Sequence, residues 1–167
     1  MIMNLLKSIV CLSLCCSVAQ AADPASAFEQ LQKLAGNWQL VVHDTEAKAA
    51  FRISYRTISR CTALVETFGD PNAGVTETIY HRDGAFLMAT HYCAQGNQPR
   101  LRLAPDSTAT TFNFTFLDVT NLAHPTDSHL VGLRFTFQPD GRLQREETYR
   151  ENGVDERSTL LLERITH

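Results

Sequence analysis

The chain has 167 residues, with 15 Lys and Arg against 18 Asp and Glu, which gives a formal net charge of −3 at pH 7. A chain of this length forms one domain, and its weakly acidic balance without a basic cluster argues against a nucleic-acid partner. No later stretch is apolar over the roughly 20 residues that a membrane-spanning helix needs, so we expect no membrane span.

Residues 1–21 have the pattern of a secretory signal peptide. Lys7 gives the positive start, residues 9–18 are apolar, and Ala19-Gln20-Ala21 matches the small-x-small cleavage pattern. We therefore expect an exported protein, periplasmic or secreted, with residues 22–167 as its single domain.

Three of the five cysteines lie in the expected signal peptide. Cys15 raises the alternative of a lipoprotein, but Leu14 stands where lipid attachment prefers a small residue. Cys61 and Cys93 remain, and an even number in an oxidising compartment predicts a disulfide. Such a bridge would stabilise the fold by roughly 3–4 kcal/mol in the chain-entropy model. Two unpaired thiols are the alternative.

A short helix is predicted over residues 25–34. Phe28, Leu31 and Leu34 form an apolar stripe on one helix face, and Gly36 follows just past the end.

From residue 37 onward the apolar pattern alternates with period two, and turn pairs such as Asp83-Gly84 and Asn152-Gly153 interrupt it. Strands in immediate succession predict an all-β, antiparallel up-and-down barrel of about ten strands, because closure removes the sheet edges. The expected strands are residues 37–44, 50–59, 62–68, 75–81, 85–92, 100–104, 110–119, 130–138, 142–150 and 155–165.

Alternation places Phe112, Phe114 and Phe116 on one face of their strand, and Phe135 on the apolar face of the next strand. We expect these rings inside the barrel, where they either line a cavity or fill the core. Residues 142–156 are polar at alternate positions, which predicts that one side of these strands faces solvent.

The helix followed by Gly36-Asn37-Trp38 and a long meander resembles the calycin superfamily, which includes lipocalins, fatty-acid-binding proteins and nitrobindin-like barrels. The resemblance implies that Trp38 packs across a closed end and that the barrel binds a small, partly apolar molecule. Nitrobindin-like barrels bind haem through a histidine, but Leu40 stands where they have a further glycine. We therefore expect no haem and no other cofactor.

A second resemblance rests on three segments, Ala63-Leu64-Val65-Glu66-Thr67, Thr90-His91-Tyr92-Cys93 and Gly96-Asn97-Gln98-Pro99-Arg100. They are similar to a group of bacterial lipocalin-like proteins. This likeness supports the fold and implies no activity.

The segment from Thr90 to Arg100 carries the densest set of polar and turn-forming groups. One hypothesis is a ligand site, with Arg100 for a carboxylate or phosphate and His91 and Asn97 as hydrogen-bond donors. The alternative is a loop whose side chains satisfy its own backbone. Glu66, which lies between Leu64 and Phe68 on its strand face, is the expected internal partner of Arg100.

We expect a binding protein rather than an enzyme, because no nucleophile, metal-ligand or phosphate-binding spacing is recognisable. Cys93, His91 and Asn97 match a thiol-nucleophile set only in residue type. The alternative function is an envelope-associated interaction module with a filled barrel and no ligand. The candidate ligand-binding residues are His91, Asn97, Arg100, Glu66, Tyr55, Phe112, Phe114, Phe116 and Phe135.

Overall fold

The structure, a computed structural model, describes residues 21–42, 51–70 and 74–166. The expected signal peptide, apart from Ala21, lies outside these residues, as does the stretch 43–50 between the first two strands. Among the described residues, no helix has the length and hydrophobicity needed to cross a bilayer.

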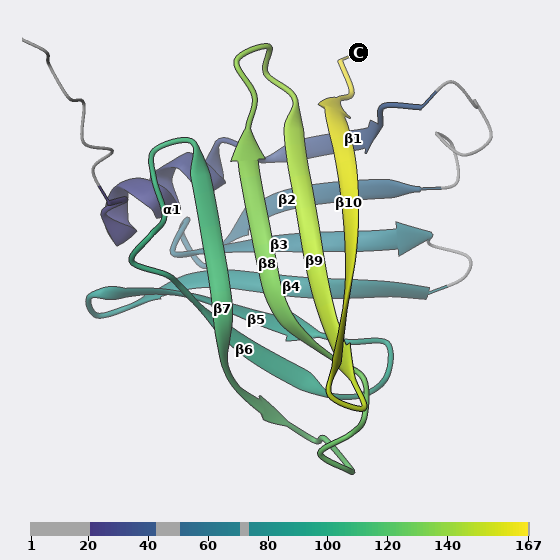
Figure 1. Cartoon of the computed structure of the whole chain (residues 1–167). Helices are drawn as coiled ribbons and strands as arrows, with labels where there is room; N and C mark the ends of the chain where they lie inside the picture. The colour runs from purple at the N-terminus through teal and green to yellow at the C-terminus, as the bar shows by residue number, and fades with distance from the viewer. Residues whose placement is uncertain (1–20, 43–50, 71–73, 167) are drawn as a thin grey trace, which may run out of the picture.

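Ten antiparallel strands close into one barrel, which confirms the predicted all-β up-and-down fold with a short N-terminal helix. Each strand pairs with its neighbours in the chain, and β1 pairs with β10 to close the ring. In Figure 1, β1 to β4 run across the view and β8 to β10 run down it. The elements are α1 Pro24–Gln32, β1 Gly36–Leu40, β2 Arg52–Ile58, β3 Ala63–Asp70, β4 Gly74–Asp83, β5 Phe86–Tyr92, β6 Gln98–Leu103, β7 Thr111–Thr120, β8 His129–Phe137, β9 Leu143–Glu151 and β10 Val154–Arg164.

The hairpin turns follow the expected chemistry. Asn152 and Gly153, between β9 and β10, have φ values of 52° and 77°. These are the left-handed conformations that a tight hairpin requires and that Asn-Gly adopts readily. The local sequence therefore explains the register of this hairpin.

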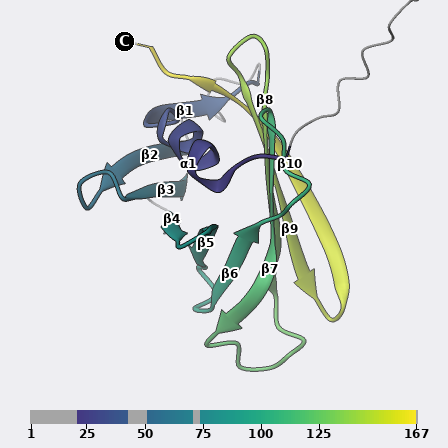
Figure 2. The ribbon, with the colours of Figure 1, turned by 90° about the vertical axis from the view of Figure 1, so that its left-hand side faces the viewer.

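Helix α1 covers one end of the barrel, which we call the helix end (Figure 2). Asp23 caps it by accepting a hydrogen bond from the Ser26 backbone at 3.0 Å. Phe28 and Leu31 are buried in the core. Trp38 is also buried at this end, where its indole nitrogen donates to the Leu34 carbonyl at 2.8 Å.

Aromatic rings fill the barrel next to the helix end. Tyr80, Phe114 and Phe135 form a mutual edge-to-face group, with ring centroids 5.7–6.3 Å apart. Phe112 is buried beside them and contacts Phe137 at 5.1 Å. Phe112, Phe114 and Phe135 therefore pack against other side chains as core.

The predicted disulfide is wrong, because Cys61 and Cys93 are both free thiols. In an up-and-down barrel, turns after even-numbered strands lie at one end and turns after odd-numbered strands at the other. Cys61 follows β2 at the helix end, where Gln32 of α1 donates to its carbonyl at 2.6 Å. Cys93 follows β5 at the opposite end, which we call the open end. The barrel length separates the two sulfur atoms.

Candidate functional site

The inner face of four neighbouring strands, β2 to β5, carries a row of polar side chains. In the strand register, Glu66 on β3 lies opposite both Tyr55 on β2 and Thr78 on β4, and Thr78 lies opposite His91 on β5. Side chains of directly paired residues point to the same side of the sheet. Because Leu64, two residues before Glu66, is a core residue, this row faces the barrel interior.

Arg145 reaches this row from β9. Its Nη2 donates to Glu66 Oε1 at 2.7 Å and its Nε donates to Glu66 Oε2 at 3.3 Å. The Tyr80 hydroxyl donates to the same carboxylate at 3.0 Å, and the Arg145 guanidinium lies 4.6 Å from the centre of the Phe68 ring. The side chains of Arg145 and Glu66 are only 1% and 0% exposed, so this is a fully buried ion pair.

A second carboxylate completes the group. Glu147, two residues further along β9, places Oε1 2.8 Å from Arg145 Nη1, although Nη1 makes no hydrogen bond of good geometry. The Tyr55 hydroxyl, also buried, has no hydrogen-bond partner among the described residues. We call Tyr55, Glu66, Tyr80, Arg145 and Glu147 the polar cluster. It holds two acidic groups and one basic group.

The pKa values in the polar cluster follow from this arrangement. Burial lowers the pKa of Arg145, but the attraction of Glu66 and Glu147 outweighs it, so this pKa lies well above its ordinary value. Burial, and then the negative charge of Glu66, raise the pKa values of Tyr55 and Tyr80 well above normal. Arg145 therefore stays charged and both phenols stay neutral.

His91 forms a second group nearer the open end. Its Nδ1 lies 2.9 Å from Thr78 Oγ1, and its Nε2 lies 3.1 Å from the Tyr149 hydroxyl. Burial lowers the pKa of His91 more than nearby Glu147 raises it, so the imidazole is neutral at pH 7. Tyr149 has its pKa raised first by burial and then by Glu147 and the Cys93 thiol.

The inner face is accessible to solvent along part of β10. Ser158 and Glu156 lie opposite Glu147 and Tyr149, so they share the inner face, yet both are exposed. Within the described residues, β1 pairs with Leu162–Arg164 of β10, and the Val41 backbone adds one bond to the Leu161 carbonyl, so the earlier part of β10 extends beyond this seam. The polar cluster therefore lies beside an exposed stretch of the inner face of β10.

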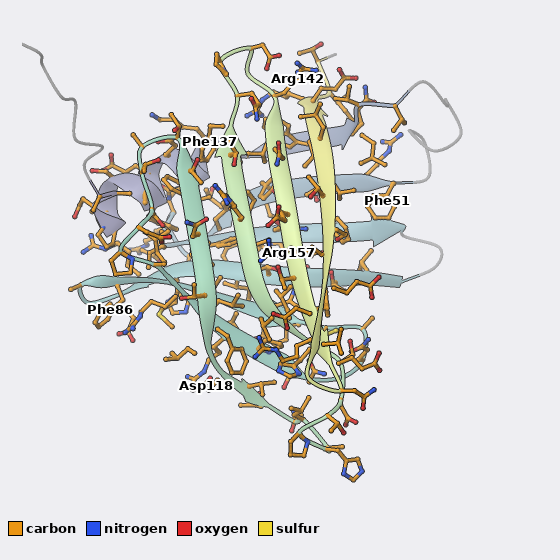
Figure 3. All side chains as sticks on the ribbon, viewed as in Figure 1. Phe51, Phe86, Asp118, Phe137, Arg142 and Arg157 are labelled. Carbon is orange, nitrogen blue, oxygen red and sulfur yellow. The ribbon has the colours of Figure 1, made fainter. Side chains whose placement is uncertain are left out.

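Arg100 lies outside this site. It is exposed on β6 and forms a two-point ion pair with Asp118 of β7, whose side chain is labelled in Figure 3. The expected pair of Arg100 with Glu66 is therefore wrong. Alternation along β6 explains the difference, because Pro99 and Leu101 are buried and Arg100 between them points outward.

Asn97 is buried, but its amide donates to the Ser128 carbonyl at 3.0 Å, so it ties two open-end loops together. His91 has Thr78 and Tyr149 as its partners, so the structure does not assemble a Cys93–His91–Asn97 set. Phe116, 38% exposed, lies against His129 with ring centroids 5.4 Å apart.

Of the predicted residues, the structure brings Tyr55, Glu66 and His91 together inside the barrel. Arg145, Glu147 and Tyr149 were missed, because β9 carries polar residues at most positions. The available signal was the alternation Leu143, Arg145, Glu147, Tyr149, which begins with a core residue.

Within the described residues, no three His, Cys, Asp or Glu side chains are placed to hold a metal ion. Comparison of the sequence with protein-family models and with curated proteins finds no match. The geometry of the polar cluster is therefore the basis for the functional argument.

Proposed function

We propose that this chain is an exported binding protein of lipocalin-like type that holds a small, partly apolar molecule at the open end of its barrel. The observation that carries the proposal is the polar cluster, buried in the barrel, next to an inner face that is exposed along β10. Few precisely placed polar groups beside apolar and aromatic walls are typical of small-molecule sites.

The packing restricts where such a molecule would bind. The rings of Tyr80, Phe114 and Phe135 occupy the part of the barrel next to α1. A ligand would therefore lie between the polar cluster and the open end, with the half-buried Tyr149 as one wall. The unpartnered Tyr55 hydroxyl supports this location, because a buried polar group without a partner is costly unless water or a ligand group satisfies it.

A second candidate function is an interaction module with a filled barrel. The edge-to-face packing of Phe114 and Phe135 favours it, because these rings occupy the space at the helix end that a deep pocket would need. In that case the polar cluster would be structural and partners would bind the outer surface.

Substitutions at two exposed, neighbouring residues of β10 distinguish the two candidate functions. Ser158 lies on the inner face opposite Glu147, and Thr159 lies on the outer face opposite Glu146. Under the binding proposal, Ser158→Trp fills the space beside the polar cluster, whereas Thr159→Trp adds the same bulk outside.

The measurement is titration with the neutral apolar fluorophore N-phenyl-1-naphthylamine, together with native mass spectrometry of the purified protein to detect retained small molecules. We expect Ser158→Trp to weaken fluorophore binding at least about tenfold, a loss of about 1.4 kcal/mol, and Thr159→Trp to leave it unchanged. No binding to the unaltered protein, or equal losses in both variants, would favour the filled module.

A further inference from the structure

The polar cluster contains more negative than positive charge. Glu66 and Glu147 share the single guanidinium of Arg145, so the formal charge of the group is −1. The other cluster members, Tyr55 and Tyr80, and the nearby His91 do not balance this negative charge, because all three are neutral. Glu156, further out on the same inner face, adds another acidic group.

We propose that the polar group of the ligand is a protonated amine that binds against Glu147, with its apolar part directed toward the open end. This inference rests on the proposed binding function and names the class of ligand. Glu147 is the acceptor in position to bind this amine. It is the next inward-facing residue after Arg145 in the direction of the open end, and it is 7% exposed.

A second observation points to a missing group at this place. Tyr55 is 2% exposed, and its hydroxyl lies close enough to Glu66 and Arg145 for both to shift its pKa, yet it makes no hydrogen bond of good geometry among the described residues. A phenol oxygen accepts a hydrogen bond as readily as it donates one. An ammonium group, which has three donors, could satisfy Glu147 and a further acceptor of this cluster together.

A carboxylate ligand fits less well. Both carboxylate oxygens of Glu66 already receive hydrogen bonds from Arg145, so this guanidinium is neutralised before any ligand arrives. A third carboxylate would meet two like charges in a buried setting, where like-charge contacts are strongly unfavourable. Arg100, the cation expected from the sequence to serve a carboxylate, is on the outer face with Asp118.

The test compares three probes that share a similar alkyl chain and differ in their polar group, namely octylamine, octanoate and octanol. Each is used as a competitor of N-phenyl-1-naphthylamine near neutral pH. We expect octylamine to displace the fluorophore at a concentration at least about tenfold lower than octanoate does, since a charge-assisted hydrogen bond is roughly twice as strong as a neutral one. Glu147→Gln should remove most of this preference and leave displacement by octanol unchanged.

The matched control is Glu146→Gln, which removes the same charge from the outer face of the same strand. Because Glu147 is buried and its variant could misfold, Ser158→Lys provides an independent test on an exposed position opposite Glu147. The introduced ammonium should weaken octylamine binding about tenfold, and Thr159→Lys on the outer face should not.

The outcomes separate this inference from the proposed function. If the fluorophore binds but octanoate competes as well as octylamine, the amine assignment is wrong and the binding function stands. An amine preference that persists in Glu147→Gln would also overturn it, because the attraction would then come from the acidic surface. If the fluorophore does not bind the unaltered protein, both proposals fail.

Discussion

Arg145→Ala tests whether the buried ion pair holds the two sides of the barrel together. The substitution leaves Glu66 and Glu147 buried without their cation. Removing one partner of a buried pair typically costs about 3–5 kcal/mol of unfolding free energy. With about 2–4 °C per kcal/mol for a domain of this size, the Tm should fall by about 6–20 °C.

Arg100→Ala is the matched control, because Arg100 and Asp118 form an exposed ion pair whose side chains are 48% and 43% exposed. Exposed pairs contribute about 0–1 kcal/mol. Urea unfolding can be followed through the fluorescence of Trp38, the single tryptophan, which is buried at the helix end.

Equal losses of stability in the two variants would refute the assignment of the buried pair. A second check adds Glu66→Gln to Arg145→Ala. The double variant should recover part of the lost stability, because it removes one uncompensated buried charge while the glutamine still accepts from Tyr80. A further loss would show that Glu66 is not coupled to Arg145.

Three other predictions follow from the same contacts. Because His91 has a lowered pKa in the folded state, the unfolded chain takes up a proton at this residue first as the pH falls. The free energy of unfolding should therefore decrease by up to about 1.4 kcal/mol per pH unit below about pH 6.5. Denaturant midpoints measured from pH 8 to 5 should show this decrease, and His91→Gln should flatten the profile. Tyr80→Phe should destabilise by about 1–3 kcal/mol because Glu66 loses a donor, whereas Tyr55→Phe should cost less than about 1 kcal/mol because that hydroxyl has no partner; a larger cost for Tyr55→Phe would mean that its hydroxyl is engaged. Alkylation of unfolded, non-reduced protein should label both Cys61 and Cys93, with Cys61 reacting faster in the folded state because it is exposed; an unlabelled pair would show a bridge.

The barrel was predictable because its determinants are local. Alternating apolar residues and turn pairs such as Asn152-Gly153 specify hairpins, and successive hairpins leave few alternatives to a closed meander. The separation of Cys61 and Cys93 follows from the same topology, since the numbers of the strands that they follow, two and five, place them at opposite ends. The disulfide prediction was wrong because it treated the ends of all strands as if they lay at the same end of the barrel.

The site was only partly predictable, because alternation tells which residues share a face but not which face is inside. Glu66 was identified through its apolar neighbours Leu64 and Phe68, which mark the inner face of β3. On β9, Leu143 at the start of the strand is the only core residue that marks the face of Arg145 and Glu147, and both alternate with other polar residues, so the signal was weak. Their inward direction is set by strand pairing across the barrel, which depends on residues distant in the sequence.

The polar cluster also bears on why this barrel would keep charges in its interior. A buried ion pair is seldom more stable than well-packed apolar side chains of similar volume, and the neighbouring rings of Tyr80, Phe114 and Phe135 show that this interior accommodates such packing. The extra carboxylate of Glu147 adds a further cost that Arg145 alone does not offset. A cationic ligand would relieve that cost only in the folded state, so its binding should raise the Tm in a concentration-dependent way. At a ligand concentration one hundred times Kd, the free energy of unfolding should increase by about 2.7 kcal/mol.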